Sequence, residues 1–354
     1  MGLSHPILGS GLRNWLSMLG ENFGVIPVGK YPQLAFLTAA VAGGIPLRAW
    51  EKIRFSKQIK QTKVESPVFI IGYYRSGTTF LHYLLGCDSR FAFPDTYQVM
   101  LPNIFLSGGS RFRSIIQNAL PETRPMDNLK MGAGMPKEEE FALLNTCGAS
   151  LAKGYVFPKK LIEYNDRYVL FENGKSNEER WKTGLDLFLK KVSVANGGKR
   201  LIVKTPANTA RIKQLLELYP DARFIHIHRN PFYVYHSNMK MLNKIVGMMA
   251  LTSFTEKQLS EFLLHSYASV YDKFNETKSL IPAGQFAEVQ YETFVQNPLL
   301  HLADIYSKLN LGDFKDAKPA LEKELESYKN YETNKFELDE VSEKLVKERW
   351  GRFL

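Results

Sequence analysis

The sequence predicts an α/β protein with a parallel sheet flanked by helices. First, the apolar run Val68–Ile71 leads through a glycine-containing turn into a helical pattern. Second, later strands alternate with helical stretches, which is typical of a parallel, helix-covered sheet. Third, 354 residues of which 44% are hydrophobic can bury a sizeable core.

The elements are predicted in chain order from apolar periodicity and from turn residues. Helices and turns precede the first strand, and a helix over Thr78–Leu85 follows it. Later helices are predicted over residues 136–147, 178–194, 208–219, about 261–278 and 298–309. Later strands are predicted over residues 200–204, 223–228 and 285–290.

This order of elements predicts one α/β domain over residues 65–312. A largely helical insertion at 95–198 is expected to shape an acceptor pocket. A helical lead-in, 1–64, comes before the domain, and a charged helical extension, 313–354, follows it.

The charge balance is basic, with 46 Lys and Arg against 36 Asp and Glu and a net charge of +10. Nucleic acid, an anionic membrane surface and acidic small ligands could each account for it. The chain has no nucleic-acid-binding signature and no long basic block, so we expect no nucleic-acid partner. Two cysteines and no metal-ligand spacing favour a cytoplasmic protein without a metal site.

An apolar stretch, residues 34–47, lies in the lead-in. Its length of about 14 residues is short of the roughly 20 that span a bilayer. Trp50, Lys52 and Arg54 follow it, which favours a peripheral contact with a membrane surface over a span. No secretory signal is recognisable.

The turn after the first strand has the spacing of a P-loop, with Gly72 and Gly77 five residues apart. The lysine of an ATP- or GTP-binding loop is missing, and Arg75 supplies a charge from inside the loop. Backbone N–H groups and the helix dipole favour an anion at such a place. The groups expected to bind it belong to Arg75, Ser76, Gly77, Thr78 and Thr79. The alternative is an ordinary tight turn.

A second basic motif follows the strand at residues 223–228. Arg229 stands at the carboxyl end of that strand, where ligands bind in open α/β sheets. Ser237 lies two helical turns further on, so the two could hold a second phosphate. A structural ion pair of Arg229 is the alternative.

Together, these motifs resemble the sulfotransferases that use 3'-phosphoadenosine 5'-phosphosulfate (PAPS), and most closely their broad, largely bacterial branch with arginine in the loop. The segments 201–212 and 291–298 also resemble that branch. The resemblance implies that residues 75–79 bind the 5'-phosphosulfate and that Arg229 and Ser237 bind the 3'-phosphate. It also implies release of 3',5'-ADP.

Two further groups are candidates for catalysis. Lys204 ends the second long strand at the same sheet edge and could reach the donor, although it could equally be a solvated lysine. An acceptor hydroxyl needs a general base, for which Glu138 and then Glu139 are the best candidates. The alternative is that these acids only favour the first turn of a helix.

The acceptor is expected to be a lipid, a sterol or another amphiphilic alcohol, because methionines at 239, 241, 248 and 249 offer an adaptable apolar surface. A carbohydrate sulfotransferase, a non-catalytic nucleotide-binding protein and a P-loop kinase are the alternatives. Gln98 and Asn103 stand where the branch often has an acid or a histidine, which leaves Asp95 as another nearby acid.

Overall fold

The computed structural model describes residues 5–124, 126–127, 129–172, 174–328 and 340–354. Residues 329–339 of the predicted C-terminal extension therefore lie outside the described residues. The chain forms two compact units. The sheet unit comprises Val64–Phe93, Lys199–Met241 and Ser260–Leu354, and the helical unit comprises Met1–Lys63, Pro94–Gly198 and Leu242–Leu259.

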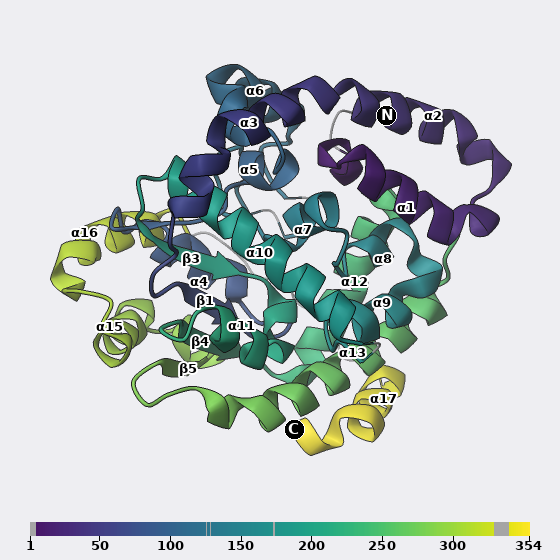
Figure 1. Cartoon of the computed structure of the whole chain (residues 1–354). Coiled ribbons are helices and arrows are strands. Elements are labelled where there is room, and N and C mark those ends of the chain that lie inside the picture. The colour runs from purple at the N-terminus through teal and green to yellow at the C-terminus, as the bar shows by residue number, and fades with distance from the viewer. Residues whose placement is uncertain (1–4, 125, 128, 173, 329–339) are drawn as a thin grey trace. The chain divides into compact units, whose positions relative to one another are not determined.

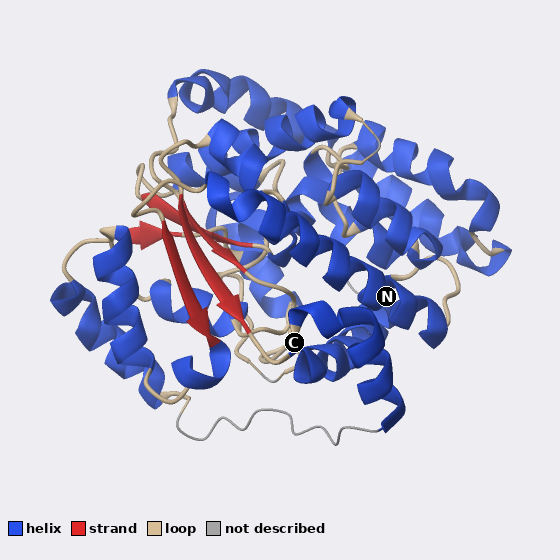
Figure 2. Ribbon diagram, turned by 90° about the horizontal axis from the view of Figure 1, so that it is seen from below, coloured by secondary structure: helices blue, strands red, loops and turns tan. Residues whose placement is uncertain are grey.

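The sheet has five strands in the order β2-β3-β1-β4-β5, and every pairing is parallel (Figure 2). The strands are β1 Val68–Ile71, β2 Phe91–Ala92, β3 Arg200–Lys204, β4 Arg223–His228 and β5 Phe286–Gln290. The predicted α/β class and four of the strands are confirmed. The sequence did not predict β2, because two residues are too few to show a period.

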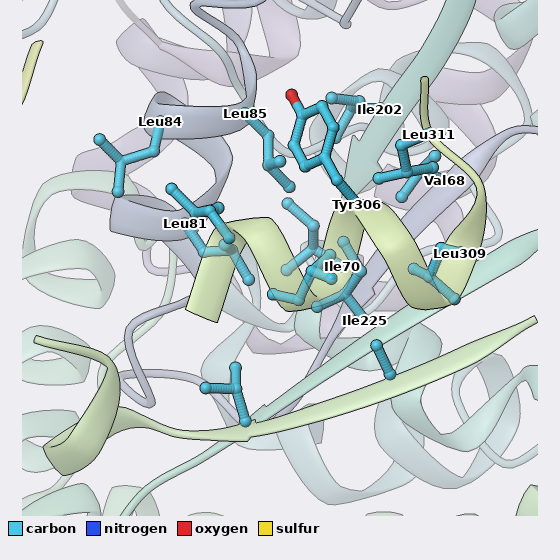
Figure 3. Close-up of a cluster of buried hydrophobic side chains, with 14 of the residues drawn as sticks. Val68, Ile70, Leu81, Leu84, Leu85, Ile202, Ile225, Tyr306, Leu309 and Leu311 are labelled. Carbon is cyan, nitrogen blue, oxygen red and sulfur yellow. The ribbon is translucent and has the colours of Figure 1, made fainter. Parts of the chain in front are cut away.

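Both faces of the sheet are covered, as parallel sheets require. On one face, Val68, Ile70 and Ile225 lie in a buried cluster with residues of helices α4 (Thr78–Leu85) and α15 (Pro298–Leu309) (Figure 3). On the other face, Phe69 lies 5.8 Å from Phe224 between ring centroids, and His226 lies 4.4 Å from Phe274. The period of two along each strand therefore decides which side chains reach which helices.

The helices before and around the first strands follow the labels of Figure 1. They are α1 Leu12–Asn22, α2 Tyr31–Gly43, α3 Ile45–Gln61, α4 Thr78–Leu85, α5 Thr96–Met100, α6 Phe105–Ala119, α7 Glu140–Thr146, α8 Lys153–Val156, α9 Leu161–Tyr168 and α10 Lys175–Ala195. Those from α5 to α10 confirm that the insertion between β2 and β3 is largely helical.

The later helices alternate with β4 and β5 and then close the chain. They are α11 Ile212–Leu218, α12 Pro231–Met249, α13 Glu256–Thr277, α14 Tyr291–Phe294, α15 Pro298–Leu309, α16 Phe314–Glu326 and α17 Glu340–Trp350. Short 3₁₀ turns lie at Pro6–Gly9 (η1), Phe23–Val25 (η2), Val28–Lys30 (η3), Pro158–Lys160 (η4), Pro206–Ala210 (η5), Lys278–Leu280 (η6) and Gly351–Phe353 (η7).

Three predicted helix starts are wrong. The helix predicted from about residue 261 begins at Glu256, where Thr255 and Gln258 exchange hydrogen bonds at its N-terminus. The helix predicted over 208–219 begins only at Ile212, after the 3₁₀ turn η5. The hydroxyl of Thr209, within η5, accepts a hydrogen bond from the N–H of Gly72 and holds this segment against the turn that follows β1. The helix predicted from residue 136 begins at Glu140, because Pro136 forms a β-bridge with Asp95 and keeps the chain extended there.

Candidate active site

The turn between β1 and α4 requires its two glycines. Gly72, Arg75 and Gly77 all have positive φ, at 135°, 68° and 93°. A Cβ on Gly72 would lie 2.0 Å from the carbonyl oxygen of Ile227, and one on Gly77 would lie 2.3 Å from the ring of Tyr291. Side chains are excluded at both positions, so the backbone can pass close to β4 and to α14.

The turn presents polar groups suited to an anion. The hydroxyl oxygen of Ser76 is buried and has no hydrogen-bond partner among the described residues. Gly77 is the N-cap of α4 and offers no side chain to cap the first N–H groups of that helix. A buried hydroxyl and the positive end of a helix fit the 5'-phosphosulfate that the sequence predicts here.

Arg229 and Ser237, the second predicted phosphate site, form hydrogen bonds with the turn. Nε of Arg75 donates to the hydroxyl oxygen of Ser237 at 2.9 Å, across 162 residues of sequence. Arg229 donates to the carbonyl oxygen of Arg75 at 3.3 Å, while its own Nε, although buried, has no partner among the described residues. The structure thus brings Arg75, Arg229 and Ser237 into one cationic cluster.

Tyr291 contacts Arg229, and Glu292 contacts the next residue, Asn230; no individual role was expected of either from the sequence. The guanidinium carbon of Arg229 lies 4.4 Å from the centre of the Tyr291 ring, a cation–π contact. Oε1 of Glu292 accepts a hydrogen bond from the N–H of Asn230 at 3.1 Å. Burial raises the pKa of Tyr291, although the charges of Arg229 and Arg75 act against that rise. The signal that could have found them was their place directly after a parallel strand.

Lys204 brings an ammonium group to a loop that has no lysine of its own. It is buried at the end of β3, in register with Ile70, and its Nζ donates to the hydroxyl of Thr79 at 3.3 Å. The interpretation of Lys204 as a solvated residue is therefore wrong. Thr209 forms a second hydrogen bond between the segment after β3 and the glycine turn, since its hydroxyl accepts the N–H of Gly72 at 2.8 Å.

An aromatic stack anchors the turn from behind. Tyr73 is buried, and its hydroxyl bonds with that of Ser266. Its ring meets Tyr267 edge-on at 4.9 Å, and Tyr267 stacks on Trp350 at 3.9 Å. Nε1 of Trp350 donates to the carbonyl oxygen of Leu264 at 3.0 Å. The turn therefore rests on α13 and on the last helix, α17, a link with no local sequence signal.

The two predicted bases, Glu138 and Glu139, and the adjacent Glu140 belong to the helical unit and have different surroundings. Glu140 is buried at the first position of α7, and its Oε1 accepts the N–H of Leu151 at 2.7 Å. Glu139 is the N-cap and is fully buried, whereas Glu138 precedes it and is half-buried. The Glu140 carboxylate thus holds the backbone at Leu151, beyond the end of α7, and Glu138 lies before the first turn of that helix.

The other nearby polar residues have structural roles. Asp95 caps α5, forms a capping box with Gln98, and pairs with Arg113 at 2.6 Å. Burial raises the pKa of Asp95. Asn103 donates to the carbonyl oxygen of Gly9 at 2.9 Å. No group of three or more His, Cys, Asp or Glu in the described part of the chain could hold a metal ion.

The parallel sheet and the glycine turn at its carboxyl edge define an α/β protein whose turn has the spacing of a P-loop. Comparison with known proteins specifies it further. A model of the sulfotransferase family matches residues 67–316. The chain belongs to the sulfotransferase family, and it is an enzyme of that family. The resemblance seen in the motifs is confirmed at this level.

Two named relatives are also sulfotransferases. The chain is 30% identical over 351 residues to the omega-hydroxy-beta-dihydromenaquinone-9 sulfotransferase Stf3 of Mycobacterium tuberculosis, across 98% of this chain and 89% of the relative. The protein of the same name from Mycobacterium bovis matches equally.

Solved structures show the same fold. Sulfotransferase STF1 from Mycobacterium tuberculosis has a TM-score of 0.70 at 19% identity, covering 96% of this chain and 90% of that one. Sulfotransferase STF9 from Mycobacterium avium has a TM-score of 0.69 at 19% identity, covering 93% and 86%.

Proposed function

We propose that this enzyme transfers the sulfonate group of PAPS to the hydroxyl of a lipid-like alcohol. The observation that best supports PAPS as the sulfonate donor is the hydrogen bond between Arg75 and Ser237, which joins the two predicted phosphate sites. Arg229 lies in the same cluster, and its buried Nε has no hydrogen-bond partner in the part of the chain that the structure describes. The relatives named for a hydroxylated dihydromenaquinone support a lipid-like acceptor.

The residues of this chain divide the chemistry between them. PAPS supplies an activated sulfonate when bound. Arg75 and Lys204 stabilise negative charge on the leaving phosphate oxygen, as positioned donors do in group transfer. Glu138 or Glu139 accepts the proton of the acceptor hydroxyl. At the same time the oxygen of that hydroxyl bonds to the sulfur of PAPS, and the bond between the sulfur and the bridging phosphate oxygen breaks. The product of the donor is 3',5'-ADP.

We also propose the domain organisation expected from the sequence. It has an α/β domain over residues 65–312, in which the insertion at 95–198 shapes the acceptor pocket, and a helical segment on either side of the domain. None of the described helices is both long enough and apolar enough to cross a membrane. We propose a cytoplasmic enzyme that contacts a membrane surface peripherally.

The test is sulfonate transfer by the purified full-length chain from sulfur-labelled PAPS, in detergent and with EDTA present. Acceptors would be a hydroxylated menaquinone, a sterol and an oligosaccharide in parallel. We expect label on the menaquinone alcohol and no effect of EDTA. Label on the oligosaccharide alone would replace the lipid acceptor with a carbohydrate. Tight binding of 3',5'-ADP without any transfer would favour a non-catalytic nucleotide-binding protein.

A further inference from the structure

The first 63 residues carry most of the excess positive charge of the protein. They contain eight Lys and Arg against two Glu, a net +6 of the +10 of the whole chain. Both glutamates are engaged within the helical unit: Glu21 pairs with Lys153 at 3.0 Å, and Glu51 pairs with Lys191 at 2.6 Å. Basic groups therefore dominate the charge that this segment presents to the outside.

The same segment exposes apolar side chains. Residues 22–47 contain one charged residue, Lys30. Helix α2 packs against α1 and η1, and Figure 1 shows α1 and α2 side by side. It buries Leu34, Leu37 and Val41, but its other side, which includes Tyr31 and Phe36, is exposed and bears no charge. A surface helix of a globular protein normally places charged residues on that side.

Helix α3 places apolar and basic side chains together on its exposed side. Ile53 is 75% exposed and Trp50 is 58% exposed, and the exposed Lys52 and Arg54 stand next to them in sequence. Its buried residue Glu51 faces the unit through the pair with Lys191. Exposed tryptophan and isoleucine beside Lys and Arg are typical of segments that lie at a membrane interface.

We propose that this N-terminal face, defined by the exposed residues Phe23, Val28, Phe36, Leu47, Trp50 and Ile53, docks on an anionic lipid bilayer. The basic excess selects an anionic surface, which a neutral bilayer or a second copy of this basic segment would not provide. The proposal deepens the proposed function, because a bilayer is where a lipid alcohol is dissolved. The docked helices lie in the interface and do not cross it.

The experiment is co-sedimentation of the full-length chain with phosphatidylcholine vesicles, with and without phosphatidylglycerol. We expect binding to the vesicles that contain phosphatidylglycerol, and loss of binding as salt is raised. Binding that is equal on both vesicles and insensitive to salt would overturn the anionic assignment. No binding to either would overturn the docking face.

Two variants that make the same change at matched exposure locate the contact. Ile53→Glu should weaken vesicle binding by about tenfold, because an apolar side chain no longer enters the interface. Leu300→Glu is the control, since Leu300 is 68% exposed on α15 and outside the N-terminal face. Equal weakening by both variants would mean that net charge, and not this face, governs binding. Lys52→Gln should weaken binding by about fivefold.

The docking face and the proposed function can fail separately. Sulfation of a menaquinone alcohol in detergent, without vesicle binding, would refute only the docking face. Vesicle binding without any sulfation would refute the function and leave the face in place. Light scattering after size-exclusion chromatography checks the competing occupant. A dimer that Ile53→Glu dissociates, in a chain that does not bind vesicles, would make this face a contact between copies and overturn the proposal.

Discussion

The two regions that the proposed chemistry requires are built differently. In the sheet unit, the donor turn is tied to distant segments, through Arg75 to Ser237, Thr79 to Lys204 and Gly72 to Thr209. In the helical unit, the backbone before the acidic turn is bridged to Asp95 through Pro136, and the Glu140 carboxylate accepts the N–H of Leu151, eleven residues away. Long-range ties fix the donor groups in place before any ligand binds, as a site for charge stabilisation requires.

The comparison also separates roles within each region. Glu138 and Glu139 are the candidate bases expected from the sequence, and the structure engages the adjacent Glu140 with the N–H of Leu151. In the donor region the structure adds Lys204, Tyr291 and Trp350 to the residues named by the loop motif. The donor site is therefore larger than its motif, and the set of candidate bases is smaller than its acidic cluster.

The largest expected effect is at the acidic turn. Glu138→Gln or Glu139→Gln should lower kcat by about 10²–10⁴, because the acceptor hydroxyl loses its general base. Glu140→Gln is the control, and should lower the melting temperature while changing kcat by less than about tenfold, since its carboxylate serves the loop. The change in kcat is measured from turnover of a lipid alcohol at saturating PAPS. Full activity of both variants would place the base elsewhere.

Arg75→Ala should lower kcat by about 10²–10³, the cost of removing one positioned donor. Arg75→Lys should recover part of the loss, because it restores the charge without the bidentate fork. The control is Arg90→Ala: Arg90 belongs to the same unit but pairs with Asp88 at 2.7 Å, so its loss should affect stability and not turnover. Unchanged kcat in Arg75→Ala would remove it from the reaction.

Trp350→Phe tests the aromatic anchor with less risk to folding than Trp350→Ala. We expect Ala to raise KM for PAPS by about tenfold and Phe to raise it less, because Tyr267 loses its stacking partner and supports Tyr73 less firmly. The kcat at saturating PAPS should change little. A lower melting temperature in both variants with unchanged KM would reduce Trp350 to a purely structural role.

The smallest expected effect is a pH dependence of stability from His82. Burial, and then the charge of Lys204, lower the pKa of this histidine well below its ordinary value. A group with a depressed folded-state pKa contributes stability above its unfolded pKa and loses it as pH falls below that value. His82 alone contributes at most about 1.4 kcal/mol of loss per pH unit.

Urea unfolding at about pH 7.5 and about pH 5.5 measures this loss. The variant His82→Leu should show a smaller loss between the two conditions. Burial lowers the pKa of His5 and His226 as well, so part of the dependence should remain. An identical loss in wild type and His82→Leu would show that His82 does not contribute.

The parallel α/β class, the strand, turn and helix around Arg75, and the family could all be predicted from the sequence. These depend on local signals: the period of apolar residues, glycines where φ is positive, and motif spacing. The sequence also named Arg229 and Ser237, because strand ends of a parallel sheet converge at one edge.

Which polar groups meet follows from the tertiary structure. It placed Lys204 on Thr79, stacked Arg229 on Tyr291, and delayed the start of α7 to Glu140 by bridging Pro136 to Asp95. It also paired Glu21 with Lys153 and Glu51 with Lys191, and left Trp50 and Ile53 exposed. Contacts between residues far apart in the chain leave no local period, so they follow from packing and not from any single stretch of sequence.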